Sequence, residues 1–451
     1  MVKPVGDPCF RPCLFPLASP REVSDARHVP ARHSPGGGHV QTIQLAFPLR
    51  QPDQFAWWSD SDFNPDVHTL LLDAHRRIAQ STPAADGRLQ VEAELLPLRS
   101  ATKSQRQEML LYYLLAQCAR ARDLGRSTHF IRALDWCSRA ELIAGALLDY
   151  GAQVDLHELR GTLHRAVSLY WIAAEEFSYA IHLLREHAED RQSFDPDFEI
   201  TLAAKAAAME YLLGLGALPR ALEHMQQAAA LLPLARASVA GQGTVEWTLA
   251  LLHRQRNELA EALRHVEVAT SLYRQLGTLN STCRVLSLAA DIALDLAESA
   301  HGEDREDRVD GVDEEVGEDG RAQASREGYL MQASIYIEEA LRVGLEAHDV
   351  EGSALARLSR ARLTHVRGDG AESSSPEAEI REVLRQARQM HDDSLMTAAQ
   401  TALGNNLLAQ KKTEMGKRWL AKAIATATGA NAPGLAFRAQ RSLRRAVGRN
   451  V

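Results

Sequence analysis

The sequence is poor in aromatic residues and cysteines, and it lacks long apolar runs. Only 6% of its 451 residues are aromatic while 45% are hydrophobic, and this favours close-packed helices over sheets. Its five cysteines include one C-x₃-C pair with no second ligand pair, which argues against a zinc site. No run of about 18 or more apolar residues occurs, so we expect no membrane-spanning helix and a cytoplasmic protein.

The sequence signatures of common catalytic and nucleotide-binding sites are also missing. We find no glycine-rich phosphate loop, no dinucleotide fingerprint, no H-E-x-x-H and no G-x-S-x-G. Adjacent carboxylates such as Glu175 and Glu176 point to different sides of a helix. His182 and His187 miss the spacing that two metal ligands on one helix need. We therefore expect no catalytic residue, no metal, no cofactor and no enzymatic activity.

A triplet of buried-type residues with the spacing A-x₃-F-x₂-A recurs along the chain. One copy is Ala173, Phe177 and Ala180. Related triplets begin at Ala133, Ala221, Ala262, Ala333, Ile380 and Gly416. An internal period of this kind is typical of stacked helical hairpins, none of which can bury its apolar face alone.

This spacing resembles the tetratricopeptide repeat (TPR). Gly161 lies twelve residues before Ala173, where the family's first-helix glycine falls, and Leu403-Gly404 stands in the same relation to Gly416. The intervals between triplets exceed the family's period of about 34, so the array is similar to the long-period bacterial type. The resemblance implies an all-α, TPR-like right-handed superhelix (α-solenoid) of antiparallel helical hairpins with a groove that holds a protein or peptide.

Charge and proline are distributed unevenly, and they suggest boundaries between segments. Residues 301–320 carry a net charge of −8 and residues 411–451 one of +9. The predicted segments are a disordered Pro-rich segment at 1–60, an N-terminal capping helix region at 61–103, TPR-like repeats at 104–300, an acidic disordered insertion at 301–328, further TPR-like repeats at 329–430, and a basic C-terminal capping helix at 431–451.

In the family, side chains of each hairpin's first helix line the groove. Carried over by position, this implies a groove lined by Glu158, Thr162, Arg165, Glu210, Trp247, Arg254, Thr401 and Asn405. In one interpretation Arg165 and Arg254 hold a peptide carboxylate while an exposed Trp247 supplies apolar area. In the other, these are ordinary solvated helix residues and Trp247 belongs to the core.

The repeats predict a function in binding. We expect a non-enzymatic scaffold for protein or peptide partners, or the sensing and adaptor module of a bacterial signalling or transcriptional regulator. The alternative is a nucleic-acid-associated regulator that contacts phosphates through its basic C-terminal helix. A third possibility is that the acidic insertion shields the basic end. No partner is named by the sequence, and no membrane association is expected.

Overall fold

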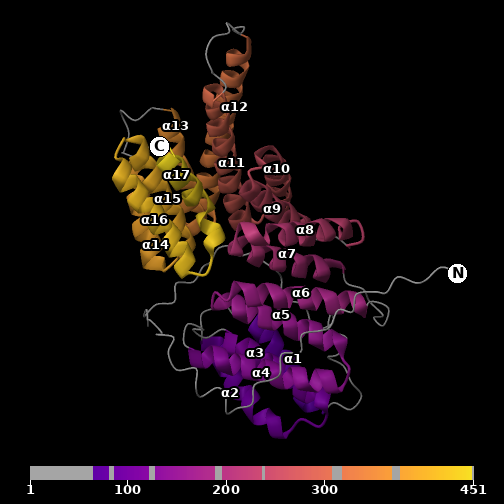
Figure 1. Ribbon diagram of the computed structural model, residues 1–451. Coiled ribbons are helices and arrows are strands. Elements are labelled where there is room, and N and C mark those ends of the chain that lie inside the picture. The colour runs from indigo at the N-terminus through magenta and orange to yellow at the C-terminus, as the bar shows by residue number, and fades with distance from the viewer. Residues whose placement is uncertain are drawn as a thin grey trace, which may run out of the picture. The chain divides into compact units, whose positions relative to one another are not determined.

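The structure is a computed structural model that describes residues 64–80, 86–120, 127–187, 196–235, 239–306, 317–367 and 376–448. All of these lie in the unit formed by residues 38–451. The predicted disordered segment at 1–60 lies outside the described residues. Within the described ranges every regular element is a helix and none is a strand (Figure 1). The all-α prediction is therefore confirmed.

The chain begins with a short helical region and continues as helical hairpins (Figure 1). The first region holds α1 (Pro65–Gln80), α2 (Asp86–Leu95) and the 3₁₀ helix η4 (Leu96–Ser100). The hairpins are α3 (Gln105–Arg120) with α4 (Ser127–Ala146), α5 (Tyr150–Ala166) with α6 (Tyr170–Glu186), α7 (Pro196–Leu213) with α8 (Leu218–Leu231) through η5 (Leu215–Ala217), α9 (Val239–Arg256) with α10 (Leu259–Leu276), α11 (Leu279–Glu306) with α12 (Gly317–Glu346), α13 (Val350–Arg367) with α14 (Pro376–Met390), and α15 (Asp393–Ala409) with α16 (Thr413–Gly429). The described chain ends with η6 (Pro433–Ala436) and α17 (Phe437–Gly448).

The hairpins stack so that their first helices share one side of the array. The two helices of each hairpin pack together, and first helices also contact one another at α3–α5, α7–α9, α11–α13 and α13–α15. We call the odd-numbered helices α3 to α15 the inner layer. This arrangement is the α-solenoid of antiparallel hairpins that the sequence predicts.

The repeated triplets fall where the sequence places them. Each of the seven lies on the second helix of a hairpin, from α4 to α16. All of their side chains are buried, and Ala173, Phe177 and Ala180 are fully so. Buried residues of α6 to α10, together with some from α5 and α11, form one apolar cluster, and the other hairpins contribute to further clusters. The triplets therefore form the core between successive hairpins, and the predicted register is correct.

Glycines on the first helices let large side chains of the second helices approach the backbone. A Cβ atom added at Gly161 would lie 2.6 Å from the ring of Phe177. At Gly404 it would lie 2.8 Å from the side chain of Leu420. Real side chains do not tolerate such distances, so only glycine allows each of these hairpins to close this tightly.

The predicted disordered insertion at 301–328 is wrong at both of its ends. Helix α11 continues to Glu306 and α12 already begins at Gly317, so residues 301–306 and 317–328 are helical. These stretches are rich in Glu, Ala, Arg and Gln, which are good helix formers. A helix that is already nucleated by its packed part extends through such residues at low cost. Residues 307–316 lie outside the described residues.

Substituting the largest triplet side chain tests the role of the triplets in the core. Phe177→Ala removes a fully buried ring and leaves a cavity, so we expect a loss of about 3–5 kcal/mol in the free energy of unfolding. Urea denaturation followed by circular dichroism measures the loss. Trp171→Ala, on the same helix but 61% exposed, should change stability by about 0.5 kcal/mol or less. Equal losses in the two variants would contradict this account.

Candidate functional site

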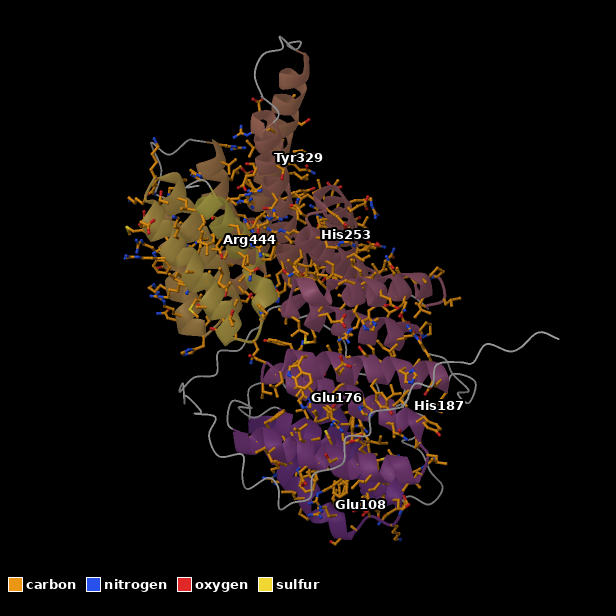
Figure 2. The ribbon with its side chains drawn as sticks, viewed as in Figure 1. Glu108, Glu176, His187, His253, Tyr329 and Arg444 are labelled. Atoms are coloured by element: carbon orange, nitrogen blue, oxygen red, sulfur yellow. The ribbon has the colours of Figure 1, made fainter. Side chains whose placement is uncertain are left out.

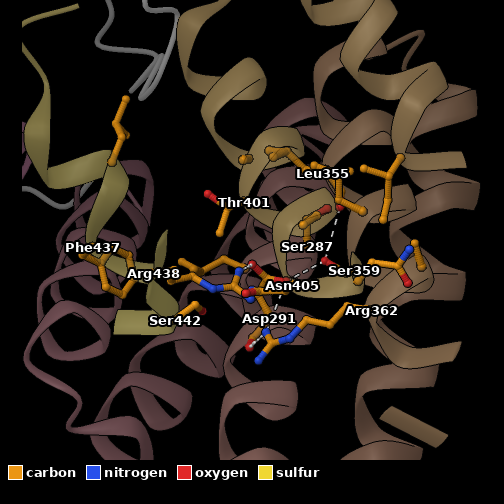
Figure 3. Close-up of a pocket in the computed structure, with 18 of the residues that line it drawn as sticks. Ser287, Asp291, Leu355, Ser359, Arg362, Thr401, Asn405, Phe437, Arg438 and Ser442 are labelled. Carbon is orange, nitrogen blue, oxygen red and sulfur yellow. Dashed lines mark hydrogen bonds and ion pairs between the residues drawn. The ribbon is translucent and has the colours of Figure 1, made fainter. Parts of the chain in front are cut away.

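A cavity of about 650 Å³ opens on the inner layer between α9 and the C-terminal helices. We call it the groove cavity. Its walls come from α9, α11, α13, α15 and α17, and Figure 3 shows their side chains converging on it. Among the lining residues are Leu251, Ser287, Leu355, Ser359, Arg362, Phe437 and Ser442. The lining thus combines apolar side chains with hydroxyl, amide and guanidinium groups.

Half of the predicted groove residues line this cavity. Trp247 and Arg254 lie on α9, and Thr401 and Asn405 lie on α15, on opposite sides of it. Sequence positions more than one hundred residues apart are thereby brought to one site. Thr401 is buried and donates its hydroxyl hydrogen bond to the carbonyl oxygen of Thr397, 2.8 Å away.

The other predicted groove residues lie outside the cavity lining. Glu158 on α5 accepts a hydrogen bond from the hydroxyl of Thr162 at 3.1 Å and pairs with Lys205 of α7. Arg165 lies near the end of the same helix and is half-buried. Glu210 of α7 is fully buried and pairs with Arg220 of α8. Burial raises the pKa of Glu210 to about 7, although the Arg220 charge opposes this. These residues connect helices of the array.

Two aspartates on α11 form the centre of an ion cluster beside the cavity. Asp291 and Asp295 are one helical turn apart. The Nε of Arg254 donates to Oδ2 of Asp295 at 2.8 Å, and its Nη2 donates to Oδ2 of Asp291 at 2.9 Å. We call these aspartates and the arginines that contact them the Asp291 cluster.

Two more arginines complete the cluster from opposite sides. Arg362 of α13 donates from Nη2 to Oδ1 of Asp295 at 2.7 Å and also lies 2.8 Å from Glu298. Arg438 of α17 donates from Nη1 to Oδ2 of Asp291 at 2.7 Å. The hydroxyl of Ser359 donates to the remaining oxygen of Asp291 at 2.8 Å (Figure 3). The cluster thus joins α9, α11, α13 and α17.

The charges of the cluster control one another's protonation. Burial would raise the pKa of Asp291, but Arg438, Arg254 and Arg362 outweigh it and hold that pKa at about 2. The same arginines hold the pKa of Asp295 well below its usual range. Although burial opposes it, the acidic partners raise the pKa values of Arg254 and Arg362. Burial lowers the pKa of Arg438, and Arg362 adds to this effect.

Of the two interpretations of the groove residues, the geometry contradicts the one with an exposed Trp247 and a free Arg254, and it agrees with the placement of Trp247 in the core. Trp247 is 6% exposed, because its ring packs edge-to-face against Tyr273 of α10 with centroids 6.0 Å apart. It is therefore not an exposed tryptophan, although an edge of it borders the cavity. Arg254 is bound by two aspartates, so its charge is not free to hold a peptide carboxylate.

Several residues of the cavity lining and of the Asp291 cluster were not identified from the sequence. Asp291 and Asp295 stand four residues apart in an otherwise apolar stretch, and a buried carboxylate needs a cationic partner. The spacing of these two aspartates could therefore have indicated a buried ion cluster. Asn406 of α15 is 7% exposed, lines the cavity, and its Nδ2 has no hydrogen-bond partner. Only the structure identifies this amide as an unused donor.

Three of the basic residues of the C-terminal region already have partners within the chain. Arg438 is bound in the Asp291 cluster. Lys417 pairs with Glu414 at 3.4 Å, and the ammonium of Lys422 lies over the ring of Trp419 at 5.0 Å. Arg444 lies on the exposed side of α17 (Figure 2). The geometry therefore does not favour the nucleic-acid alternative.

A second buried ion network lies away from the cavity, between α4, α5 and α6. His157 Nδ1 lies 2.7 Å from Glu176 Oε2, and Arg160 lies 3.0 Å from the other oxygen of Glu176 and also pairs with Glu141 (Figure 2). The network connects two successive hairpins. Across the part of the chain that the structure describes, no group of His, Cys, Asp and Glu side chains could hold a metal ion. None of the described helices is long and apolar enough to cross a membrane.

Comparison with known proteins supports the fold. No protein-family model matches the chain, and no curated protein matches it by sequence. The structure is similar to the apo form of the quorum sensor NprR from B. thuringiensis, with a TM-score of 0.52 and 13% identity over 80% of this chain and 87% of that one. Two further matches have lower TM-scores. Apo RapI has 0.49, at 10% identity over 87% of this chain and 90% of that one, and the Rap conjugation gene regulator of plasmid pLS20 with the Phr* peptide has 0.44, at 13% identity over 86% of each chain. The chain thus has the TPR-like helical-repeat fold that its spacing predicts.

Removing one aspartate tests the Asp291 cluster. Asp295→Ala deprives Arg254 and Arg362 of their shared carboxylate, and we expect it to lower the free energy of unfolding by about 3–5 kcal/mol. The matched control is Asp135→Ala on α4, whose partner Arg139 is exposed and four residues away. That change should cost about 0.5 kcal/mol or less. Urea denaturation compares the two, and a loss no larger at Asp295 than at Asp135 would refute the role of the cluster.

The depressed pKa of Asp291 predicts a pH dependence. In the unfolded chain an aspartate titrates near pH 4, whereas in the folded protein Asp291 does so at about 2. The unfolded chain therefore binds the proton first, so the stabilisation is complete above about pH 4 and is lost as the pH falls towards 2. Asp291→Asn should show a shallower loss of stability over this range than the wild type. Urea denaturation at stepped pH values gives the free energy of unfolding as a function of pH for both proteins. If the two curves run parallel, the predicted contribution of Asp291 is excluded.

Proposed function

We propose that the groove cavity binds a peptide or a segment of a partner protein, and that the protein is a non-enzymatic adaptor or the sensing module of a bacterial regulator. The observation that carries this proposal is the cavity itself. It lies on the inner layer, it is walled by first helices of several hairpins, and it contains the unused amide donor of Asn406.

The chemistry of the lining suits a peptide. Apolar side chains such as Leu251, Leu355 and Leu358 can take up a ligand side chain. Amide and hydroxyl groups from Asn405, Asn406 and Ser287 can bond to polar main-chain groups, of which a peptide has two at nearly every residue. The charged groups are mostly satisfied within the Asp291 cluster, so they shape the wall rather than supply reactive groups.

The fold similarity supports the same function. The protein matched with a TM-score of 0.52 is the quorum sensor NprR, and a sensing role is the one that we propose for this chain. Cys137 and Cys283 are buried free thiols, which suits the reducing cytoplasm that we propose as the location of the protein. Binding, release and the resulting change in partner contacts are then the whole activity, with no chemical step.

A peptide screen tests the proposed function. A pool of synthetic peptides is passed over the immobilised full chain, and the tightest binder is identified by mass spectrometry and titrated by calorimetry. Asn406→Leu keeps the branched shape and the number of heavy atoms of the side chain but removes the unused donor. Losing one hydrogen bond costs about 1–3 kcal/mol, so we expect the affinity to fall by a factor between about 5 and about 100.

The matched control for this screen is Asn280→Leu, at an exposed position of α11 outside the cavity. It should leave the affinity unchanged. If the pool yields no binder, or if the best binder is insensitive to Asn406→Leu, the groove cavity is not the peptide site and the proposed function fails.

A further inference from the structure

The chain returns to its own groove cavity after the last hairpin. It leaves α16, turns at Asn431 in the left-handed conformation with a φ of 57°, and continues as η6 and α17. Helix η6 packs against α15 and α16 and also against α7, four hairpins earlier. We call residues 431–448 the C-terminal segment. It forms one wall of the cavity (Figure 3).

Gly434 anchors this segment to the inner layer. A Cβ atom at this position would collide with the carbonyl oxygen of Tyr211, so the backbone approaches α7 more closely than any other residue would allow. The carbonyl oxygen of Gly434 accepts a hydrogen bond from Nε2 of Gln255 at 3.3 Å. Ala432 and Ala436, on either side, are fully buried.

Two side chains of the segment then occupy positions that a bound peptide would use. The ring of Phe437 lies against the guanidinium of Arg254, with 5.8 Å between Cζ and the ring centroid. Arg438 reaches Asp291 at 2.7 Å. An aromatic ring and a charged group on consecutive residues, held at their backbone by a hydrogen bond, are the kind of contacts by which a groove holds a peptide.

Beyond the anchor at Gly434, helix α17 itself buries little. Ala439 is the one buried residue of α17. Arg438 shares the Oδ2 atom of Asp291 with Arg254, so three guanidiniums surround two aspartates. All three arginines contact both aspartates, but the side chain of Arg438 is 24% exposed, against 8% for Arg254 and 13% for Arg362. Arg438 is therefore the member of the cluster whose departure exposes the least buried charge.

We propose that the C-terminal segment is an internal ligand of the groove cavity, and that an external peptide binds only when this segment has been displaced. This inference rests on the proposed function. A tethered segment competes at a local concentration of about millimolar, so it lowers the apparent affinity of any external ligand. Displacement also converts a buried segment into a free basic helix carrying Arg438, Arg441, Arg444 and Arg445. Ligand binding is thereby linked to a change at the C-terminal surface.

The test measures binding of the segment supplied as a separate molecule. The probe is a fluorescein-labelled synthetic peptide of residues 431–448, and the receptor is the full chain carrying Gly434→Val, which expels the internal copy. We expect fluorescence anisotropy to show the probe binding this variant at least about tenfold more tightly than the wild-type chain. A second receptor, Phe437→Ala with Arg438→Glu, releases the internal copy while leaving every residue of α7 to α15 unchanged, and it should show the same gain.

Matched controls accompany both receptors. Arg444→Glu, at an exposed position of the same helix, should leave the C-terminal segment bound in the full chain, so that the probe binds this variant no better than it binds the wild type. A probe carrying Arg438→Glu should bind the released chains at least about tenfold more weakly than the unmodified probe. Circular dichroism verifies that each variant remains helical.

The outcomes separate this inference from the proposed function. The inference is overturned if both released chains bind the unmodified probe no better than the wild type does, or if the Arg438→Glu probe binds equally well. A peptide from the synthetic pool that binds wild-type and released chains with equal affinity would also overturn it, while leaving the proposed function intact. Failure of the pool screen with every receptor would instead refute the proposed function.

Discussion

Close packing between the two helices of each hairpin determines the rest of the structure. Where Gly161 faces Phe177 and Gly404 faces Leu420, the absence of a side chain on one helix admits a large one from the other. The hairpins then stack on one another, and their first helices form a shared inner layer. The groove cavity is a consequence of that layer, because residues of α9, α13 and α15 meet there only when the stacking is regular.

The Asp291 cluster supplies a connection that apolar packing cannot. Apolar contacts are non-directional, so they fix the spacing of hairpins better than their exact alignment. Asp291 and Asp295 accept bonds in defined directions from α9, α13 and α17. Burying these charges is costly, and their mutual attraction offsets much of that cost. The main effect of the cluster is therefore to align the walls of the cavity rather than to add stability.

Local sequence patterns predicted the fold well and the site only in part. The triplets are periodic, and a periodic apolar pattern indicates which side chains are buried even when the helix that covers them is unknown. Phe177 and its equivalents were therefore placed correctly in the core. Trp247 was placed on the correct helix, but its burial depends on Tyr273, which no pattern links to it. The contact between Arg438 and Asp291 spans 147 residues and leaves no local signal. The helical ends of the acidic insertion were not predicted, because a high density of charge is typical of disordered segments even where the residues favour a helix.

The C-terminal segment does more than close the end of the array. A terminal cap needs a polar outer face and contacts with the last hairpin, and α17 has both through α15 and α16. Capping does not require Gly434 to reach α7, nor Phe437 and Arg438 to reach residues of α9 and α11. These contacts lie on the face where the groove of tetratricopeptide repeats is expected, and they do not involve the last hairpin. The cost of these contacts, the burial of the Arg438 guanidinium that lowers its pKa, is understandable for a segment that must be able to leave.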